Sequence, residues 1–231
     1  MARLAKRDVR LNRNYDRWTV RIMVRVLRDD SNAVDVGCHK GSVLEDIIKL
    51  APRGAHHAFE PLPELAAKLR EKFPTVAVHE LALSDSAGTA EFRRVVDRPA
   101  YSGLRERDYP SANPLIEVIA VETAKLDDIL PSDFCVDFLK VDVEGGELQV
   151  FRGATRTLSR CKPFVVFEHG LGAAEHYGAR PEMVYDLLVG DCGLRISRLD
   201  DWLRSRAPLT RDGFVDEFDK RLNFYFLAHP A

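Results

Sequence analysis

Two acidic residues directly follow a short apolar run in the second half of the chain. Residues 138–141 read Phe-Leu-Lys-Val, and Asp142 and Glu144 come next, before a pair of glycines. Apolar residues then recur at helical spacing through residues 148–158, which is typical of a buried strand that turns into a helix. Ligands of open α/β sheets bind just beyond the carboxyl ends of such strands. Asp142 and Glu144 are therefore candidates for a functional site.

A glycine-containing turn follows the first predicted strand, residues 33–36. Asp35 lies near the end of that strand, and Gly37, Cys38 and Gly41 come after it. Gly37 permits a tight turn or a close approach of the backbone to a ligand. The glycine spacing matches neither the dinucleotide fingerprint nor the Walker A motif, so a ligand-binding loop and a plain strand-to-helix turn both fit.

Polar residues also follow the next two predicted strands. Glu60 comes after residues 55–59, where a carboxylate can bind both hydroxyls of a ribose. The alternative is a charge at the start of the next helix. Ser84 and Asp85 come after the third strand, predicted over residues 76–83, where they could hydrogen-bond an adenine amino group or simply form a turn.

A further cluster ends the strand predicted for residues 164–167. His169 is the best-placed neutral base for taking the proton of a hydroxyl nucleophile, and Glu168, Glu144 and Asp142 are its rivals. The same four side chains could instead gather a divalent cation such as Mg²⁺ or Mn²⁺. No metal-ligand spacing in the chain demands an ion, so we favour a site without metal.

Strands alternate with helices along the chain, which predicts an α/β fold with a mainly parallel sheet and helices on both faces. Residues 1–30 are expected to form a helical extension, with an amphipathic helix over 8–28, and residues 31–231 a single domain. The arginines of that helix could contact an anionic partner, but we expect them to form a solvated face. We expect further strands at 89–96, 116–121, 194–197 and 223–228, and further helices at 41–50, 63–73, 126–130 and 181–189.

The composition suits one globular domain without a strongly charged partner. The chain has 231 residues, of which 45% are hydrophobic, and a formal net charge of −2. That balance argues against a nucleic-acid partner, and no apolar run approaches the roughly 20 residues of a membrane span. Four cysteines without C-x-x-C spacing, and no apolar secretory segment, predict reduced thiols in a cytoplasmic protein.

In their order along the chain, these motifs resemble the FkbM family of S-adenosylmethionine-dependent methyltransferases. The resemblance covers roughly residues 30–230. It implies a class I methyltransferase fold, Rossmann-like, with a seven-stranded sheet whose last strand is antiparallel. It also implies O-methylation, commonly of a sugar or natural-product hydroxyl. The motifs are Asp35-Val36-Gly37 with Gly41, Phe59-Glu60-Pro61, Ala82-Leu83-Ser84-Asp85, Leu126-Asp127-Asp128, Lys140-Val141-Asp142-Val143-Glu144-Gly145 and Phe167-Glu168.

The resemblance also implies which residues hold the cofactor, S-adenosylmethionine. Asp35, Gly37 and Gly41, with Cys38 in the same loop, would line its methionine part. Glu60 would hold the ribose.

The family resemblance also implies which residues lie near the adenine and which lie near the reacting centre. Ser84 and Asp85 would lie near the adenine, and Asp142 and Glu144 near the transferred methyl group. The family usually has Ala-Asn where this chain has Cys38 and His39, so His39 is a candidate for positioning the substrate.

Two other functions remain open from the sequence. One is an NAD(P)-dependent oxidoreductase on a similar sheet, which the glycine spacing disfavours. The other is a non-catalytic partner protein that binds the cofactor. For the leading hypothesis, the acceptor is a small-molecule or glycan hydroxyl selected by residues 97–114 and 170–180. The sequence does not determine the oligomeric state.

Overall fold

Seven strands form the central sheet in a computed structural model that describes residues 2–111 and 113–231, with side chains from residue 13 onward. The strands are β1 Ala33–Val36, β2 His56–Phe59, β3 Ala77–His79, β7 Phe138–Val141, β8 Phe164–Glu168, β9 Arg195–Arg198 and β10 Tyr225–His229. Their spatial order is β3-β2-β1-β7-β8-β10-β9. β10 is antiparallel to both of its neighbours, and the other pairs from β3 to β8 are parallel. The predicted α/β fold with an antiparallel last strand is confirmed.

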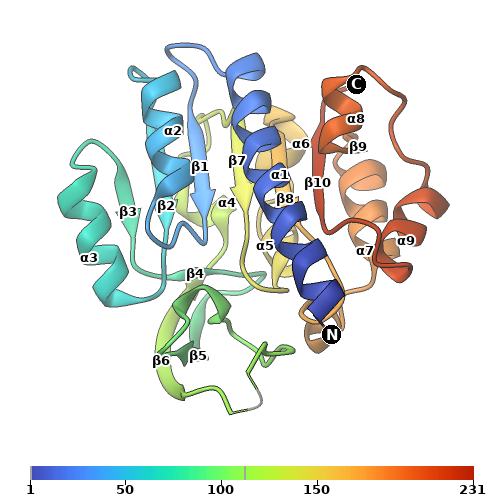
Figure 1. The fold of residues 1–231 in the computed structure, drawn as a ribbon. Helices are drawn as coiled ribbons and strands as arrows, with labels where there is room; N and C mark the ends of the chain where they lie inside the picture. Colours follow the sequence, from blue (N-terminus) through green and yellow to red (C-terminus); the bar gives the residue numbers. More distant parts are fainter. Residues whose placement is uncertain (1, 112) are drawn as a thin grey trace.

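Helices cover both faces of this sheet (Figure 1). Helices α1, α2 and α8 contribute to the apolar core on one face, and α5, α6, α7 and α9 to the core on the other. The bounds are α1 Ala2–Val26, α2 Ser42–Leu50, α3 Pro63–Lys72, α4 Leu126–Ile129, α5 Glu147–Arg152, α6 Thr155–Cys161, α7 Pro181–Tyr185, α8 Leu199–Leu203 and α9 Arg211–Asp219. A π-helical turn, Asp186–Asp191, continues α7, and 3-10 turns lie at Pro99–Tyr101 and Ala174–Tyr177.

The strand residues divide between these two cores because successive side chains of a strand point to opposite faces. In β7, Phe138 packs in the cluster that contains Ile22 and Met23 of α1, whereas Leu139 packs in the cluster that contains Leu148. By the same alternation, Lys140 shares the face of Phe138. Lys140, which is only 5% exposed, thus lies within a buried strand, close to its carboxyl end.

Three strands form a separate sheet, drawn in green below the main sheet in Figure 1. β4 Ala82–Leu83 pairs in parallel with β6 Ile116–Ala124, which pairs antiparallel with β5 Gly88–Val95. The strands predicted at residues 89–96 and 116–121 are therefore confirmed, and the structure shows that they form a hairpin. The irregular residues 97–114 connect its two arms.

Several predicted boundaries were wrong. The strand expected over 76–83 is two strands in different sheets, β3 and β4. The helical run over 148–158 is broken between α5 and α6 at Gly153, where a Cβ would lie 2.1 Å from the carbonyl oxygen of Ser84. Helices α8 and α9 were missed because each is short and its apolar residues are few. α1 begins before residue 8.

The basic residues after α8 pair with acids of the same chain, as a solvated surface would. The pairs are Arg204–Asp200 at 3.2 Å, Arg206–Asp201 at 2.8 Å and Arg211–Asp186 at 2.7 Å. Among the described helices, none combines the length and the apolar character that a bilayer span requires.

Candidate active site

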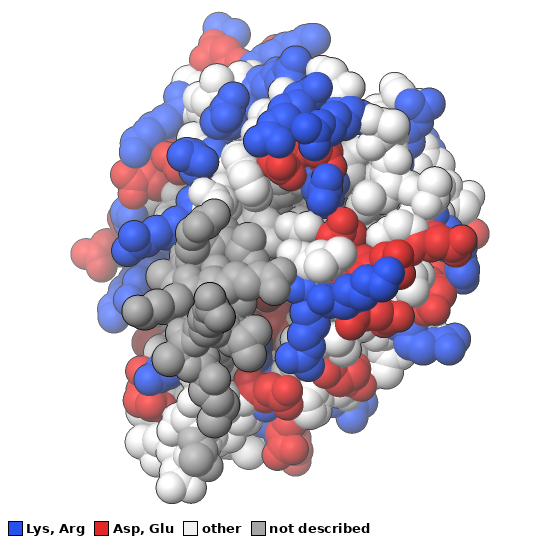
Figure 2. Space-filling model, turned by 45° about the vertical axis from the view of Figure 1, so that its right-hand side comes forward, with Lys and Arg blue, Asp and Glu red and all other residues white. Residues whose placement is uncertain are grey.

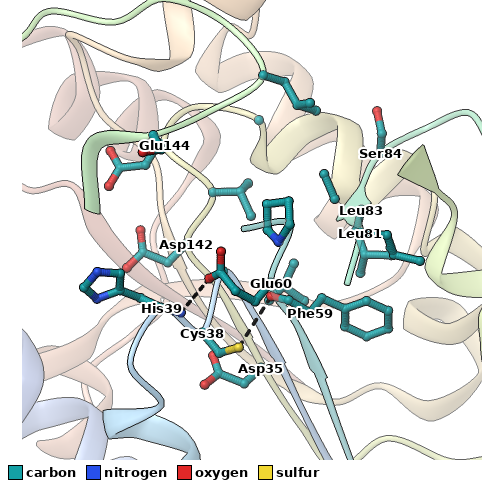
Figure 3. Close-up of a pocket in the computed structure, with 18 of the residues that line it drawn as sticks. Asp35, Cys38, His39, Phe59, Glu60, Leu81, Leu83, Ser84, Asp142 and Glu144 are labelled. Atoms are coloured by element: carbon teal, nitrogen blue, oxygen red, sulfur yellow. Dashed lines mark hydrogen bonds between the residues drawn. The ribbon is translucent and has the colours of Figure 1, made fainter. Parts of the chain in front are cut away.

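The carboxyl ends of several strands open into one cavity of about 940 Å³, here called the first cavity (Figure 3). Asp35 of β1, Glu60 after β2, Ser84 after β4 and Asp142 after β7 line it. The structure therefore brings together residues that lie up to 107 positions apart in the sequence. This is the edge of the sheet at which the sequence predicted ligand binding.

The two glycines of the first turn have different roles. Gly37 has a φ of +76°, and a Cβ there would lie 1.9 Å from the carbonyl oxygen of Asp142. Only glycine fits, because two strand ends meet there backbone to backbone. Gly41 also has a positive φ, but it is not among the described residues that line the first cavity. A Cβ at Gly41 would lie 2.6 Å from Phe73 and 2.7 Å from Leu69, so its placement supports packing of the turn rather than cofactor contact.

Asp35 and Glu60 are buried carboxyls, 2% and 4% exposed. Burial raises the pKa of each to about 7, although backbone N–H groups favour the ionised forms. The N–H groups of His39 and Leu62 donate to Oε2 and Oε1 of Glu60 at 2.9 and 3.0 Å. Oδ2 of Asp35 has no hydrogen-bond partner among the described residues. A buried acceptor of this kind is suited to a ligand that brings its own donor.

Cys38 and His39 differ in where their side chains lie. The thiol of Cys38 is 3.5 Å from the carbonyl oxygen of Phe59, and burial raises its pKa, so it stays neutral. His39 has a φ of +49° and its ring lies beside Asp142 (Figure 3). Burial lowers the pKa of His39, with Lys40 acting in the same direction and Asp142 opposing. The chain thus places a neutral imidazole at the cavity wall.

Ser84 and Asp85 line the other end of the first cavity. Oγ of Ser84 lies 3.5 Å from Oδ1 of Asp85, and Arg152 forms a long ion pair with Asp85 at 3.9 Å. The buried side chains of Leu83 and Phe92 line the same region. Polar atoms beside apolar side chains suit a flat heteroaromatic ring with an amino group.

Three carboxylates cluster where β7 and β8 end. Asp142, Glu144 and Glu168 each offer an oxygen within 4.8 Å of the others. Lys140 Nζ lies 2.8 Å from Oδ2 of Asp142, and Arg107 forms an ion pair with Glu144. Glu144 has a φ of +59°, which turns the chain sharply at this point. The cluster therefore already contains two basic side chains that offset part of its negative charge.

The pKa values of Asp142 and Glu168 are shifted in opposite directions by this environment. Burial opposes ionisation of Asp142, but Lys140, with hydrogen bonds from Glu168 and Tyr225, outweighs it and lowers the pKa. Burial and the neighbouring Asp142 charge raise the pKa of Glu168 well above its usual range. The pair therefore holds one proton, on Glu168, over a range in which an exposed glutamate would have lost it.

Glu147 holds the turn that carries Glu144. It is 1% exposed, and its Oε1 accepts hydrogen bonds from the N–H groups of Val143 and Gly145 at 3.2 and 3.1 Å. Burial raises the pKa of Glu147 to about 7. The conformation of the acidic turn thus depends on a carboxyl two residues beyond it.

A second cavity of about 670 Å³ adjoins the first. Its lining is aromatic and charged, and includes Tyr101, Arg107, Tyr109, Glu168 and Phe224. The described residues that line both cavities are Asp16, Ala100, Asp142, Glu144 and Tyr225. The carboxylate cluster therefore lies at the junction of two cavities.

Two loops that were expected to select the acceptor do contact each other. The N–H of Asp108 donates to the carbonyl oxygen of Gly172 at 2.7 Å. The N–H of Arg105 donates to the hydroxyl of Tyr177 at 3.0 Å. Parts of both loops line the second cavity. Their role in acceptor selection stays a prediction.

His169 lies apart from the carboxylates, contrary to the expected convergence. Its ring stacks on Phe218 at 4.7 Å and on Phe214 at 6.0 Å, both residues of α9. It is fully buried, lines neither cavity among the described residues, and burial lowers its pKa to about 3. The ring points into the apolar core because strand alternation turns it away from the face of Glu168. This placement argues against His169 as the base or as a metal ligand.

Four residues of the cluster were not singled out from the sequence: Lys140, Tyr225, Glu147 and Arg107. Lys140 had a signal, since a lysine two residues before Asp142 in an apolar strand must point to the same face. The position of Tyr225 in the cluster depends on the pairing of β10 with β8, and the position of Arg107 depends on the path of residues 97–114. Neither arrangement is encoded in local spacing.

The comparisons with known proteins agree with this geometry. Residues 35–203 match the Methyltransferase FkbM domain. The chain is 28% identical over 165 residues to the 2-O-methyltransferase NoeI of Sinorhizobium fredii (strain NBRC 101917 / NGR234), a match over 62% of this chain and 64% of that protein. It is similar, with a TM-score of 0.54 and 16% identity, to the crystal structure of methyltransferase FkbM from Methylobacillus flagellatus KT, covering 88% of this chain and 44% of that one. The protein thus belongs to the FkbM family of methyltransferases, with the class I methyltransferase fold.

Proposed function

We propose that this methyltransferase uses S-adenosylmethionine to methylate a hydroxyl of a sugar or natural-product acceptor. The observation that carries the proposal is the junction of two cavities at Asp142 and Glu144. The family implies the cofactor, and the similarity to a 2-O-methyltransferase supports oxygen as the methyl acceptor. The bound cofactor supplies a sulfonium methyl group, so the protein contributes mainly orientation and proton removal.

The residues of the first cavity fit this cofactor. The unpartnered Oδ2 of Asp35 suits the amino group of its methionine part, and Gly37 lets the backbone approach. Each oxygen of Glu60 accepts one backbone N–H and retains a lone pair for a ribose hydroxyl. Ser84 and Asp85 lie where the adenine would be held.

The second cavity fits a polyhydroxylated acceptor. Tyr101, Tyr109 and Phe224 bring aromatic rings to its wall, against which the C–H groups of a sugar can pack; the guanidinium of Arg107 lies over the ring of Tyr101. Asp108 offers a carboxylate to neighbouring hydroxyls, and Asn223 keeps one lone pair and one N–H beyond its bonds to Tyr15 and Glu217. A cavity of about 670 Å³ has room for a sugar ring and its immediate substituents.

Glu168 is the base that this geometry favours. A hydroxyl is a poor nucleophile until a base takes its proton, and the best base has a pKa near the working pH. Once Glu168 has released its own proton, its raised pKa makes it the stronger base of the pair, whereas the lowered pKa of Asp142 makes that carboxylate a weak base. Glu144 is paired with Arg107. We therefore assign proton removal to Glu168, with Asp142, Lys140 and Glu144 holding the surrounding charge.

A divalent cation remains the alternative way to activate the hydroxyl. The three clustered carboxylates have the donor type that Mg²⁺ or Mn²⁺ prefers. Lys140 and Arg107 already supply positive charge there, so we favour the route without metal. Turnover should persist in EDTA. Loss of turnover in chelator, restored by Mg²⁺ or Mn²⁺, would assign the activation to an ion.

Isothermal titration with S-adenosylhomocysteine and with NAD tests the cofactor. We expect binding of the first and none of the second, because the first-cavity turn lacks the dinucleotide spacing. Binding of NAD alone would contradict the proposal and favour an oxidoreductase. Transfer of a labelled methyl group to a panel of glycosides and hydroxylated natural products then tests the acceptor. Cofactor binding without transfer to any tested acceptor would favour a non-catalytic protein.

A further inference from the structure

The outer face of α1 combines arginines with exposed aliphatic side chains. Arg13, Arg17, Arg21 and Arg25 are exposed, and Val20 and Val24 between them are 37% and 61% exposed. Steps of four residues advance the face of a helix by only about 40°, so the six side chains lie along one stripe. We call these six residues the α1 basic face. The opposite side of the helix is buried on the sheet.

Few acids accompany the positive charge of this face. Among the described residues, none of its arginines forms an ion pair; Arg25 hydrogen-bonds the carbonyl oxygen of Leu203 and lies over Trp202, and Arg17 bonds Asn14. The first 28 positions hold nine of the chain's 34 Lys and Arg residues but only two of its 36 Asp and Glu residues. A nearly neutral protein therefore carries a strongly basic stretch at one place.

The α1 basic face also borders the cavities. Asp16, Thr19, Val20 and Met23 of α1 line the first cavity, and Asp16 lines the second as well. Figure 2 shows many Lys and Arg side chains along the left side and the top of one face, with some Asp and Glu side chains among them. A partner bound to α1 would therefore lie beside the acceptor-binding region.

We propose that the α1 basic face docks the enzyme on an anionic lipid bilayer. Arginines near such a surface each strengthen binding about fivefold, and aliphatic side chains between them suit the interface. A single-stranded nucleic acid would instead favour exposed aromatic rings for base stacking. The described positions on this face carry valines in their place. Such docking is separate from the methyl-transfer reaction and would place the enzyme at a membrane surface.

Vesicle flotation tests the docking. The full chain is mixed with vesicles of phosphatidylcholine containing about 30% phosphatidylglycerol, or of phosphatidylcholine alone, at about 0.1 M salt. We expect binding to the anionic vesicles only, and its loss at about 0.5 M salt because screening shortens the reach of surface charges. The triple substitution Arg13→Gln, Arg17→Gln and Arg21→Gln should weaken binding on the order of 100-fold.

A matched variant removes three positive charges elsewhere. Glutamine retains good helix propensity, so the α1 variant should fold, and S-adenosylhomocysteine titration checks that it does. The control removes three exposed basic residues outside α1 and should bind anionic vesicles like the wild type: Lys68→Gln, Arg156→Gln and Arg195→Gln. Equal binding to neutral vesicles, or an equal loss in both triple variants, would overturn the proposal. So would binding of a single-stranded RNA oligonucleotide, tested in parallel, when vesicles are not bound.

Discussion

At the scale of single residues, we expect substitutions of the neighbours Glu168 and His169 to have different effects on methyl transfer. Glu168→Gln should lower kcat by roughly 10²- to 10⁴-fold, because the amide cannot take the proton, while affinity for S-adenosylhomocysteine persists. His169→Phe should retain activity, since that ring stacks between apolar rings and lacks a polar partner among the described residues. Methyl-transfer kinetics decide the point. Loss of activity in the His169 variant alone would return the base to histidine.

Glu60 tests the cofactor assignment. Glu60→Gln should weaken S-adenosylhomocysteine binding by roughly 1.5–3 kcal/mol, because a charged acceptor for the ribose hydroxyls is lost. Glu64→Gln is the matched control, since Glu64 lies in the first turn of α3, pairs with Arg94 and is not among the described residues that line the first cavity. Isothermal titration gives both affinities. An unchanged affinity for Glu60→Gln would reduce Glu60 to a structural charge.

The affinity for S-adenosylhomocysteine should also depend on pH. Burial raises the pKa of Glu60 to about 7, so its carboxyl is largely protonated at pH 6 and ionised at pH 8. Ribose hydroxyls bind the ionised form better, so affinity should rise with pH through 7, and the contribution of Glu60 should fall by up to about tenfold per unit just below 7. In Glu60→Gln, Asp35 still titrates near 7, and the dependence should become shallower. A flat profile in the wild type would contradict the assignment.

At the scale of elements, the contact between β1 and β7 depends on one glycine. Gly37→Ala would place a Cβ 1.9 Å from the backbone of Asp142 and at a positive φ, so we expect a loss of roughly 2 kcal/mol or more in unfolding free energy. Gly190→Ala is the control, because a Cβ there would meet none of the described atoms within 4 Å. Urea unfolding measures both. Equal stability of the two variants would mean that the strand ends separate easily.

The loop over residues 97–114 is fastened by a tyrosine from another segment. Tyr177→Phe removes the hydroxyl that accepts from the N–H of Arg105, so trypsin should cleave the loop faster. Tyr185→Phe, which loses a hydroxyl bond to Leu209 elsewhere, should leave the cleavage rate unchanged. Gel analysis of a digestion time course compares the two. Equal rates in all proteins would show that other contacts hold the loop.

The elements also show what local sequence encodes. Continuous apolar runs marked β1, β7 and β8, and the acids beyond them marked the edge of the site. From the sequence, the side chain of His169 is expected at the site, but alternation along β8 turns it to the core. That orientation depends on which face of the sheet each helix covers. Arg107 was missed because its place follows from the path of an irregular loop. Long-range contacts of this kind are not encoded in spacing.

At the scale of the whole molecule, the last strand completes the sheet. β10 lies between β8 and β9 and carries Tyr225, which hydrogen-bonds Asp142. A chain that ends at residue 222 should therefore lose cooperative unfolding and cofactor binding, whereas one that ends at residue 229 should keep both. Thermal unfolding followed by circular dichroism, together with titration, tests this. Cofactor binding by the shorter chain would show that β1, β2 and β7 suffice.

The second cavity is built partly from outside the stretch that the family shares. Tyr15 and Asp16 precede residues 35–203, and Phe224 and Tyr225 follow them, yet all four line that cavity. The matched segment supplies Asp35, Glu60 and Asp142, which line the first cavity. Changes in the flanking segments should therefore reshape the second cavity, while Asp35, Glu60 and Asp142 stay in place in the first cavity. Exchanging those flanks between relatives is thus a rational route to new acceptor preferences, whereas cutting a domain at the shared boundaries would remove one wall of the cavity.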